Sequence, residues 1–290
     1  MQSTQEEHSN CLASINPHKR DAYIKFYDVG HRYEITIDPT DDGTKKYTSV
    51  TTWNHSHFPK FDSDKVISQI FNGKKWNNTN KYWGMTAKQI KDMWSKNGQS
   101  VAQAGTDMHY QIECFMNMVI CGNNKPSHAD LLAHYNATRD LTLEVSEEWG
   151  FFLQFVKDYP DFIPYRTEWT IFDETVRVAG SIDMIYQNTD DGTLSIYDWK
   201  RCKDINPENN WNQFATNPML LHIPDTNYWH YTLQLNTYKK LLERQYDVQI
   251  RDLVLVRLHP DNVDKTYELI EVPILSRDME SLFEQKLGII

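Results

Sequence analysis

The chain has 290 residues, which is enough for one large domain or two moderate ones and excludes a mini-protein that depends on disulfides or a structural metal. Hydrophobic residues make up 40% and charged residues 24%, so the chain can fill a core and is not disordered. Its 30 basic and 40 acidic residues give a net charge of −10, which taken alone argues against a nucleic-acid-binding protein.

The cysteines and the apolar stretches indicate the compartment. Four cysteines, at 11, 114, 121 and 202, form no C-x-x-C pair and no disulfide framework, so we expect free thiols in a reducing compartment. The polar start of the chain is not a secretory signal, and no stretch approaches the ~18 apolar residues of a membrane span. We therefore expect a soluble, intracellular protein without a membrane partner.

Periodicity and turn residues predict the elements in chain order. They are a flexible tail over 1–20, a β-hairpin over 22–28 and 32–38, helices over 63–72, 87–97, 99–120 and 144–158, strands over 165–172, 176–187 and 193–200, a helix near 230–245, strands over 252–258 and 266–273, and a helix over 277–287. Thr86, with Gln89 three residues later, is the capping box expected to open the second helix. This order predicts an α/β (α+β) protein with a central mixed β-sheet flanked by helices and preceded by an N-terminal extension.

Positive charge is concentrated in one segment. Thr44–Ala104 contains ten lysines, three aspartates and no other charged residue, a net charge of +7, which leaves −17 for the rest of the chain. Nine aromatic residues are interleaved with these lysines. The combination suits a single-stranded nucleic acid, because lysines pair with phosphates and rings stack on bases. The alternative is a solvated lysine-rich surface over an ordinary aromatic core.

The strand Leu194–Lys200 changes character along one face. Side chains alternate across a strand, so Ile196, Asp198 and Lys200 share one face while Tyr197 lies on the other. The first face therefore passes from apolar residues to a carboxylate and an ammonium, as expected where a strand leaves the core and enters a cleft. A lone D-x-K is, however, most often a surface ion pair.

A second carboxylate follows a glycine in the preceding strand. Gly180-Ser181-Ile182-Asp183 lies fifteen residues before Asp198, with a hairpin turn between them, so neighbouring strands can bring Asp183 and Asp198 together. Two close carboxylates repel each other unless a cation neutralises them, so the pair is either an acid/base dyad or a metal site. A nearby lysine and a third ligand favour metal.

Two helices offer further polar pairs. His109 and Glu113 are four residues apart on one helical face and can bind a divalent ion directly or through water, while Gly105 would allow close approach of another backbone. Gln234 and Tyr238 are also four apart and can donate hydrogen bonds to a phosphate. Such pairs are common in helices without any such role.

Four motifs in this order resemble the RecB-like branch of the PD-(D/E)XK nuclease superfamily, which also contains lambda-type exonucleases. They are G-T-D-M-H-x-x-x-E at 105–113, G-S-I-D at 180–183, D-W-K at 198–200 and Q-x-x-x-Y at 234–238. The similarity spans about residues 100–260. The hairpin followed by Y-T-S-V-T at 47–51 is similar to the lead-in of some phage and large-virus members. Ser181-Ile182 stand where the superfamily name implies a proline, and the RecB-like branch commonly has glycine and an aliphatic residue there.

The resemblance implies a restriction-endonuclease-like nuclease core over 99–290, preceded over 21–98 by the β-hairpin and a Lys/aromatic-rich helical extension. It also implies that Asp183 and Asp198 hold Mg²⁺ or Mn²⁺, with the Trp199 carbonyl and the His109 ring completing the coordination. Oxygen ligands suit Mg²⁺, and one imidazole makes Mn²⁺ suitable as well.

The remaining roles follow from the same resemblance. Lys200 would orient or help deprotonate the attacking water and stabilise negative charge on the scissile phosphate, and Glu113 would be an outer ligand through water. Gln234 and Tyr238 would position the strand by its phosphates. Glu168 is interpreted as a structural strand residue, with an acidic contribution to the site as the alternative.

The lysine-rich extension would then act as a clamp over the nucleic acid, with Lys74, Lys75 and Lys81 as substrate-binding residues. Iron–sulfur members of the superfamily use a cysteine near the start and a cluster near the end. Cys11 and Cys202 have no such companions, so no iron–sulfur cluster is predicted.

The expected function is a Mg²⁺- or Mn²⁺-dependent deoxyribonuclease, an exonuclease on single-stranded or end-containing DNA in replication, repair or recombination. An endonuclease, a non-cleaving nucleic-acid-binding module and a different metal-dependent hydrolase are the alternatives. ATP-driven and serine-hydrolase functions have no support, because the chain lacks G-x-x-x-x-G-K-[ST], G-x-S-x-G and H-E-x-x-H motifs. The motifs do not decide whether the protein is a monomer or a homo-oligomer.

Overall fold

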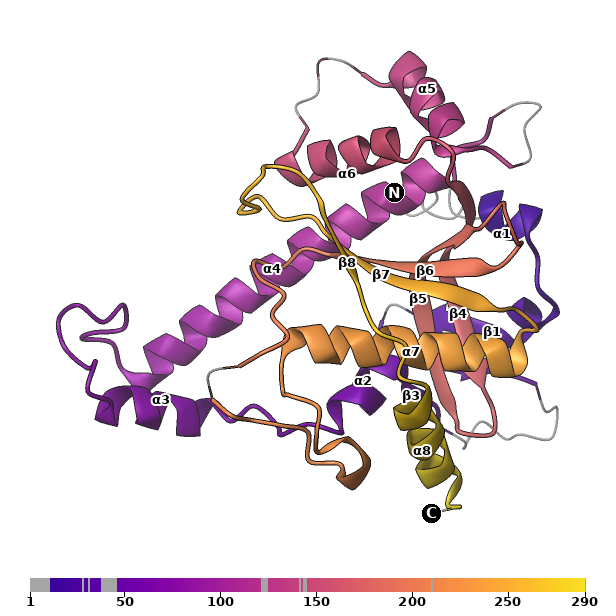
Figure 1. The fold of residues 1–290 in the computed structure, drawn as a ribbon. Coiled ribbons are helices and arrows are strands. Elements are labelled where there is room, and N and C mark those ends of the chain that lie inside the picture. Colours follow the sequence, from indigo (N-terminus) through magenta and orange to yellow (C-terminus); the bar gives the residue numbers. More distant parts are fainter. Residues whose placement is uncertain are drawn as a thin grey trace.

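A mixed β-sheet with helices on both faces forms the centre of the computed structural model (Figure 1). The structure describes residues 11–27, 29–30, 32–37, 46–120, 125–140, 142, 145–209 and 211–289. Its helices are α1 (Cys11–Ile15), α2 (Val50–His55), α3 (Ser63–Asn72), α4 (Ala87–Met116), α5 (His128–Thr138), α6 (Glu147–Asp158), α7 (Asn227–Gln245) and α8 (Ser276–Leu287), with short 3₁₀ helices at Lys19–Tyr23 and Pro218–Leu220. Its strands are β1 (Ile24–Tyr27), β2 (Arg32–Ile35), β3 (Thr48–Ser49), β4 (Ile163–Asp173), β5 (Val178–Gln187), β6 (Leu194–Lys200), β7 (Ile250–Arg257) and β8 (Glu268–Glu271).

The sheet combines antiparallel and parallel pairs. Its strand order is β3-β5-β6-β7-β8, and β4 pairs with β5 along the other edge of β5. The β4–β5–β6 part is an antiparallel meander, whereas β7 is parallel to β6 because α7 connects them as a crossover. The strands β1 and β2 form a separate antiparallel hairpin, as expected from the alternation around Gly30. The predicted mixed α/β architecture is confirmed.

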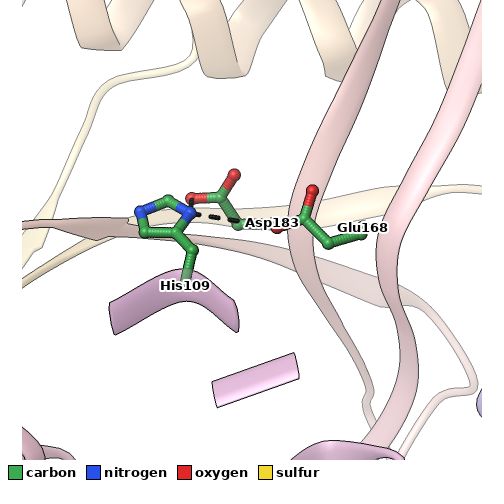
Figure 2. A group of neighbouring side chains, drawn as sticks. All are labelled: His109, Glu168 and Asp183. Atoms are coloured by element: carbon green, nitrogen blue, oxygen red, sulfur yellow. Dashed lines mark ion pairs between the residues drawn. The ribbon is translucent and has the colours of Figure 1, made fainter. Parts of the chain in front are cut away.

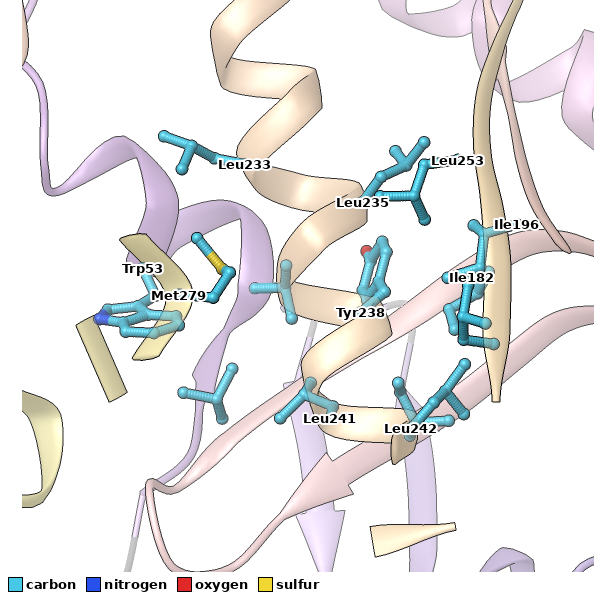
Figure 3. Close-up of a cluster of buried hydrophobic side chains, with 14 of the residues drawn as sticks. Trp53, Ile182, Ile196, Leu233, Leu235, Tyr238, Leu241, Leu242, Leu253 and Met279 are labelled. Atoms are coloured by element: carbon cyan, nitrogen blue, oxygen red, sulfur yellow. The ribbon is translucent and has the colours of Figure 1, made fainter. Parts of the chain in front are cut away.

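The two faces of the sheet carry different cores. Leu194 and Ile196 face a cluster that includes residues of α2, α7 and α8 (Figure 3), whereas Tyr197 and Trp199 face a cluster with residues of α4, α5 and α6. The predicted alternation along β6 is therefore confirmed. Because helices cover both faces, the polar residues at the end of β6 lie between two packed layers.

The strands β5 and β6 separate before β6 ends. Their pairing stops at Met184↔Tyr197, while β6 remains paired with β7 as far as Lys200↔Arg257. The short strand β3 pairs with Val178 and Ala179 on the edge of β5 that also pairs with β6, since β4 occupies the opposite edge. Gly180–Asp183 therefore lie between two ladders, where the end of β6 diverges from β5.

Residues 11–20 pack on the core where a flexible tail was expected. The Leu12 side chain is 1% exposed, and its backbone N–H donates to Oδ1 of Asn117 at 3.0 Å. Arg20 is buried and forms an ion pair with Glu174 at 2.5 Å. The expectation of a tail over 1–20 is thus wrong for Cys11–Arg20, while residues 1–10 lie outside the described part of the chain.

The predicted helices 87–97 and 99–120 are one continuous helix, α4. Gly98 does not end the first of them, because an exposed helical glycine costs only about 1 kcal/mol and is tolerated inside a long helix. Thr86 and Gln89 form the predicted capping box at its start. With α3, the first part of α4 projects away from the sheet at the left of Figure 1, and we call residues 63–97 the arm.

The arm has a small apolar core of its own. Ile67, Tyr82 and Ile90 are buried there, and Trp76 and Trp94 pack against them. For these rings, the alternative of an ordinary aromatic core is the better description. The aromatic residues Phe61 and Trp83 are 74% and 50% exposed, respectively.

Candidate active site

The end of β6 holds a buried ion pair. Asp198 is 1% exposed, and its Oδ2 lies 2.5 Å from the Lys200 ammonium. Apart from this ion pair, neither oxygen of Asp198 has a hydrogen-bond partner among the described residues. The ammonium also lies 4.6 Å from the ring centroid of Tyr231 on α7. Carboxylate and lysine therefore sit on the α7 side of the sheet, as the alternation of β6 predicts.

Burial and charge set the protonation of this pair. Burial raises the pKa of Asp198 to about 6, although Lys200 acts to lower it. Burial acts to lower the pKa of Lys200, but Asp198 and Asp183 outweigh it and raise the pKa above the usual lysine value. Lys200 is consequently an ammonium at neutral pH. It can orient a water molecule and stabilise anionic charge, but in this state it is not a base.

Asp183 connects β5 to the diverging end of β6. Its Oδ2 accepts a hydrogen bond from the Trp199 backbone N–H at 3.0 Å, in the place of a ladder hydrogen bond between the two strands. The same oxygen lies 3.5 Å from Nδ1 of His109. Burial raises the pKa of Asp183, while the attraction of His109 opposes the increase. The charge of Asp183 adds to burial in raising the pKa of Asp198.

His109 reaches the site from α4. Its Nε2 donates to the Trp199 carbonyl at 2.9 Å, because a carbonyl oxygen can only accept. Nδ1 therefore faces the carboxylates of Asp183 and Glu168 (Figure 2). Burial acts to lower the pKa of His109, but the two carboxylates outweigh it and raise the pKa to about 9. The imidazole is thus held in a strongly anionic environment.

Glu168 was interpreted from the sequence as a structural strand residue, with an acidic contribution to the site as the alternative, and the structure places it beside His109. Its Oε1 lies 3.8 Å from Nδ1 of His109, and Oε2 accepts a hydrogen bond from the Ser181 hydroxyl at 3.0 Å. One ligand atom each from His109, Glu168 and Asp183 lies within 4.8 Å of the other two. The register of the β4–β5 hairpin could have revealed Glu168 as a site residue, since the pairs Thr167↔Met184 and Trp169↔Ile182 place it opposite Asp183.

The backbone of Glu168 is unusual. Its φ is 45°, a left-handed conformation that non-glycine residues adopt rarely. Such a conformation inside a strand redirects the side chain relative to regular alternation. The left-handed conformation accompanies the turn of the Glu168 carboxylate toward Asp183. The period-two pattern of β4 therefore does not reveal Glu168 as a site residue.

Gln234 and Tyr238 lie on α7 near the carboxylates. Gln234 Nε2 donates to the Tyr238 hydroxyl at 3.3 Å, and the Tyr238 ring is 3% exposed. A Cβ on Gly180 would stand 2.7 Å from this ring and 3.0 Å from the Val50 side chain. The glycine of G-S-I-D is therefore required for the close approach of α7 to β5.

The structure does not include the other predicted site residues in this ligand group. Glu113 follows His109 by one turn of α4 and is partly buried, but it is not among the three grouped ligand residues. A Cβ on Gly105 would have nothing within 4 Å, so the expected close approach of another backbone at this glycine is wrong. Lys74, Lys75 and Lys81 are on the arm, and the start of α4 lies about 33 Å from His109 at ~1.5 Å per helical residue.

The donor set fits a hard divalent cation. Two carboxylates and one imidazole nitrogen converge, and beside them the buried Asp198 has no hydrogen-bond partner among the described residues other than the Lys200 ammonium. Buried carboxylates without donors are costly unless a cation compensates them. Oxygen-rich sites with one imidazole suit Mg²⁺ or Mn²⁺.

The mixed sheet, the diverging strands β5 and β6 and the buried D-x-K are consistent with a restriction-endonuclease-like nuclease fold, and the adjacent carboxylate–histidine cluster could hold a metal ion. The family model of the PD-(D/E)XK nuclease superfamily matches residues 102–287, which is more than half of the chain. The chain belongs to the PD-(D/E)XK nuclease superfamily, whose members are generally metal-dependent nucleases. No curated protein matches the sequence. Among the described residues, no helix combines the length and apolar character needed to span a membrane.

Proposed function

We propose that this protein is a metal-dependent deoxyribonuclease of the RecB-like type that acts as an exonuclease on single-stranded or end-containing DNA. The observation that carries the proposal is the cluster of His109, Glu168 and Asp183 beside the buried Asp198–Lys200 pair. A cation held here would activate water and neutralise the scissile phosphate. His109, Asp183 and Asp198 would hold it. Coordination by the Trp199 carbonyl as well would require that oxygen to give up its hydrogen bond with Nε2 of His109 and the ring to turn.

Lys200 supplies fixed positive charge to the reaction. Because Asp198 keeps its ammonium beside the cluster, the lysine is placed to orient the nucleophilic water and to stabilise the negative charge that develops on the phosphate. Glu113 would contact the cation through water from the next turn of α4. These roles need no movement of β6.

The α7 face supports phosphate positioning. The Tyr238 hydroxyl is already held by Gln234 at 3.3 Å, and the ring is locked against Gly180, so both polar groups are oriented before substrate binds. Preorganised donors cost less to use than mobile ones. We assign Gln234 and Tyr238 to the phosphate next to the scissile bond.

The arm supports a single-stranded substrate. Its exposed lysines, which include Lys74, Lys75 and Lys81, accompany the half-exposed ring of Trp83. Lysines that follow phosphates beside rings that stack on bases bind single strands without sequence preference. The distance of the arm from the cluster matches a strand that runs from the arm to the site over several nucleotides.

The test is a cleavage assay on 5′- and 3′-labelled single- and double-stranded DNA and RNA, with Mg²⁺, Mn²⁺ or EDTA. We expect DNA-specific cleavage with a divalent cation, none in EDTA, and loss in Asp183→Asn and Lys200→Met. Asp161→Asn, an exposed carboxylate change in the turn after α6, is the matched control and should cleave as the wild type does. Cleavage by either site variant would contradict the mechanism, and binding without cleavage by the wild type would identify a non-cleaving module instead.

A further inference from the structure

The ring of Tyr231 lies over the ammonium of Lys200 and is outside the four motifs that resemble the nuclease superfamily. We infer that Tyr231 is a positioning residue for the reaction: the face of its ring holds the Lys200 ammonium in the direction that serves the attacking water and the scissile phosphate. The inference rests on the proposed function, because it concerns the lysine of that same site.

Lys200 needs a second contact to be held in one direction. Its stem is long and flexible, and Oδ2 of Asp198, 2.5 Å away, constrains the ammonium from one side. The strand β5 does not pair with this end of β6, because their ladder stops at Met184↔Tyr197. The helix α7 instead places the Tyr231 ring centroid 4.6 Å from the ammonium, within the ~6 Å reach of a cation–π contact.

The ring of Tyr231 is itself held in place. Its hydroxyl donates a hydrogen bond to the Cys202 sulfur, so a partner other than Lys200 engages its polar end. The ring also packs against the core cluster between the sheet and α7, which limits its movement. The Lys200 side chain is only 15% exposed, and a cation–π contact becomes stronger as water is excluded. A fixed ring can therefore fix the ammonium in turn.

A neutral ring suits this position better than a second carboxylate would. Lys200 already has the carboxylate of Asp198 in contact, and another anion would oppose the positive charge that the scissile phosphate needs. The phenol of Tyr231 is neutral at neutral pH, so it attracts the ammonium through its electron-rich face and adds no charge to the site. Asp198 and Tyr231 together therefore set the direction of the ammonium without a second negative charge beside it.

The experiment measures kcat and KM of the full chain on single-stranded DNA, with the divalent cation that supports wild-type cleavage. We expect kcat to fall roughly 10- to 100-fold in Tyr231→Leu with KM nearly unchanged, because a misplaced lysine stabilises the transition state less without weakening substrate binding. Tyr231→Phe keeps the ring and should retain most of the wild-type kcat. Tyr228→Leu changes another partly buried tyrosine of α7 in the same core cluster, and this matched control should keep the wild-type kcat.

Fluorination of the ring separates a cation–π contact from packing. In Tyr231→Phe made with phenylalanine that carries an increasing number of ring fluorines, the ring keeps nearly its shape while its face attracts a cation less, so kcat should fall stepwise. Circular dichroism and thermal melting check that each variant is folded. An equal kcat across the fluorinated series, wild-type kcat in Tyr231→Leu, or a change in KM alone would overturn the inference while leaving cation-dependent cleavage intact. A wild type that does not cleave would instead overturn the proposed function, and the inference with it.

Discussion

The buried pair of Asp198 and Lys200 links catalysis to stability at the scale of single residues. Lys200→Met removes the charge that compensates a carboxylate of 1% exposure, so we expect a loss of about 3–5 kcal/mol in the free energy of unfolding. The double variant Asp198→Asn/Lys200→Met removes both charges and should recover most of that loss. Urea unfolding measures the stability of both variants.

The same two variants separate folding from chemistry. Neither should cleave DNA, because both lack the positive charge that Lys200 supplies to the scissile phosphate. If the double variant were as unstable as Lys200→Met, the cost would come from packing of the lysine stem and not from the unpaired carboxylate.

Gly180 gives a second prediction at this scale. In Gly180→Ala the new methyl group would stand 2.7 Å from the Tyr238 ring, which cannot move away from a packed core, so we expect a destabilisation of roughly 1–3 kcal/mol with reduced cleavage. Gly105→Ala is the control, because its Cβ has nothing within 4 Å and alanine is the better helix former by about 0.5–1 kcal/mol. Thermal melting should therefore move in opposite directions for the two variants.

At the scale of elements, the arm is expected to carry electrostatic binding. Lys74→Gln/Lys75→Gln/Lys81→Gln should weaken binding of single-stranded DNA and lower the salt slope by about 2, at roughly 0.7 for each phosphate that a lysine no longer neutralises. Fluorescence anisotropy at several salt concentrations measures the slope. Lys25→Gln/Lys157→Gln, exposed lysines of β1 and α6, form the control, and an equal slope in the triple variant would remove the arm from the binding surface.

The meander that carries the site could be predicted, because β4, β5 and β6 are rich in β-branched and aromatic residues and Asp190-Asp191-Gly192 marks the turn between β5 and β6. The helix α5 was missed, since its sequence HADLLAHYNAT does not concentrate its apolar residues on one face. The helix α4 was predicted as two helices over 87–97 and 99–120, but the glycine between them is too weak a signal to interrupt continuous helical hydrogen bonding.

The site shows the same division between local and long-range information. The motifs that resemble the RecB-like branch contain His109, Asp183, Asp198 and Lys200, so the convergence of these residues could be predicted. Glu168 belongs to no such motif, and its direction depends on a left-handed backbone that periodicity cannot show. The expected register between β4 and β5 was the information that could have identified Glu168.

At the scale of the whole molecule, two buried histidines should make folding sensitive to acid. Burial lowers the pKa of His128 to about 3 and that of His57 to about 4, so both are neutral in the folded protein while the unfolded chain binds protons below pH ~6.5. The contribution of these two histidines to the free energy of unfolding should therefore be fully present above pH ~6.5 and decline as the pH falls. Each histidine contributes a loss of about 2 kcal/mol between pH ~6.5 and pH ~5.

His128→Gln tests this origin, because glutamine is neutral and can still bond the Tyr186 hydroxyl, which lies 2.9 Å from Nε2 of the histidine. Urea unfolding at about pH 7.5 and about pH 5 should show a smaller difference between the two conditions in the variant. An unchanged difference would assign acid sensitivity to other groups.

Because α4 is one continuous helix, it fixes both the distance between the arm and His109 and the angle of the arm about the helix axis. Each residue of an α-helix turns the chain by ~100°, so one alanine inserted after Gln99 would swing the lysines of the arm to another side of the molecule while moving them only ~1.5 Å along the axis. Seven inserted residues would restore the angular phase to within about 20° but lengthen the helix by ~10 Å. If the strand runs from arm to cluster, cleavage should fall steeply with one inserted residue and recover in part with seven, so the activity would follow the helical period.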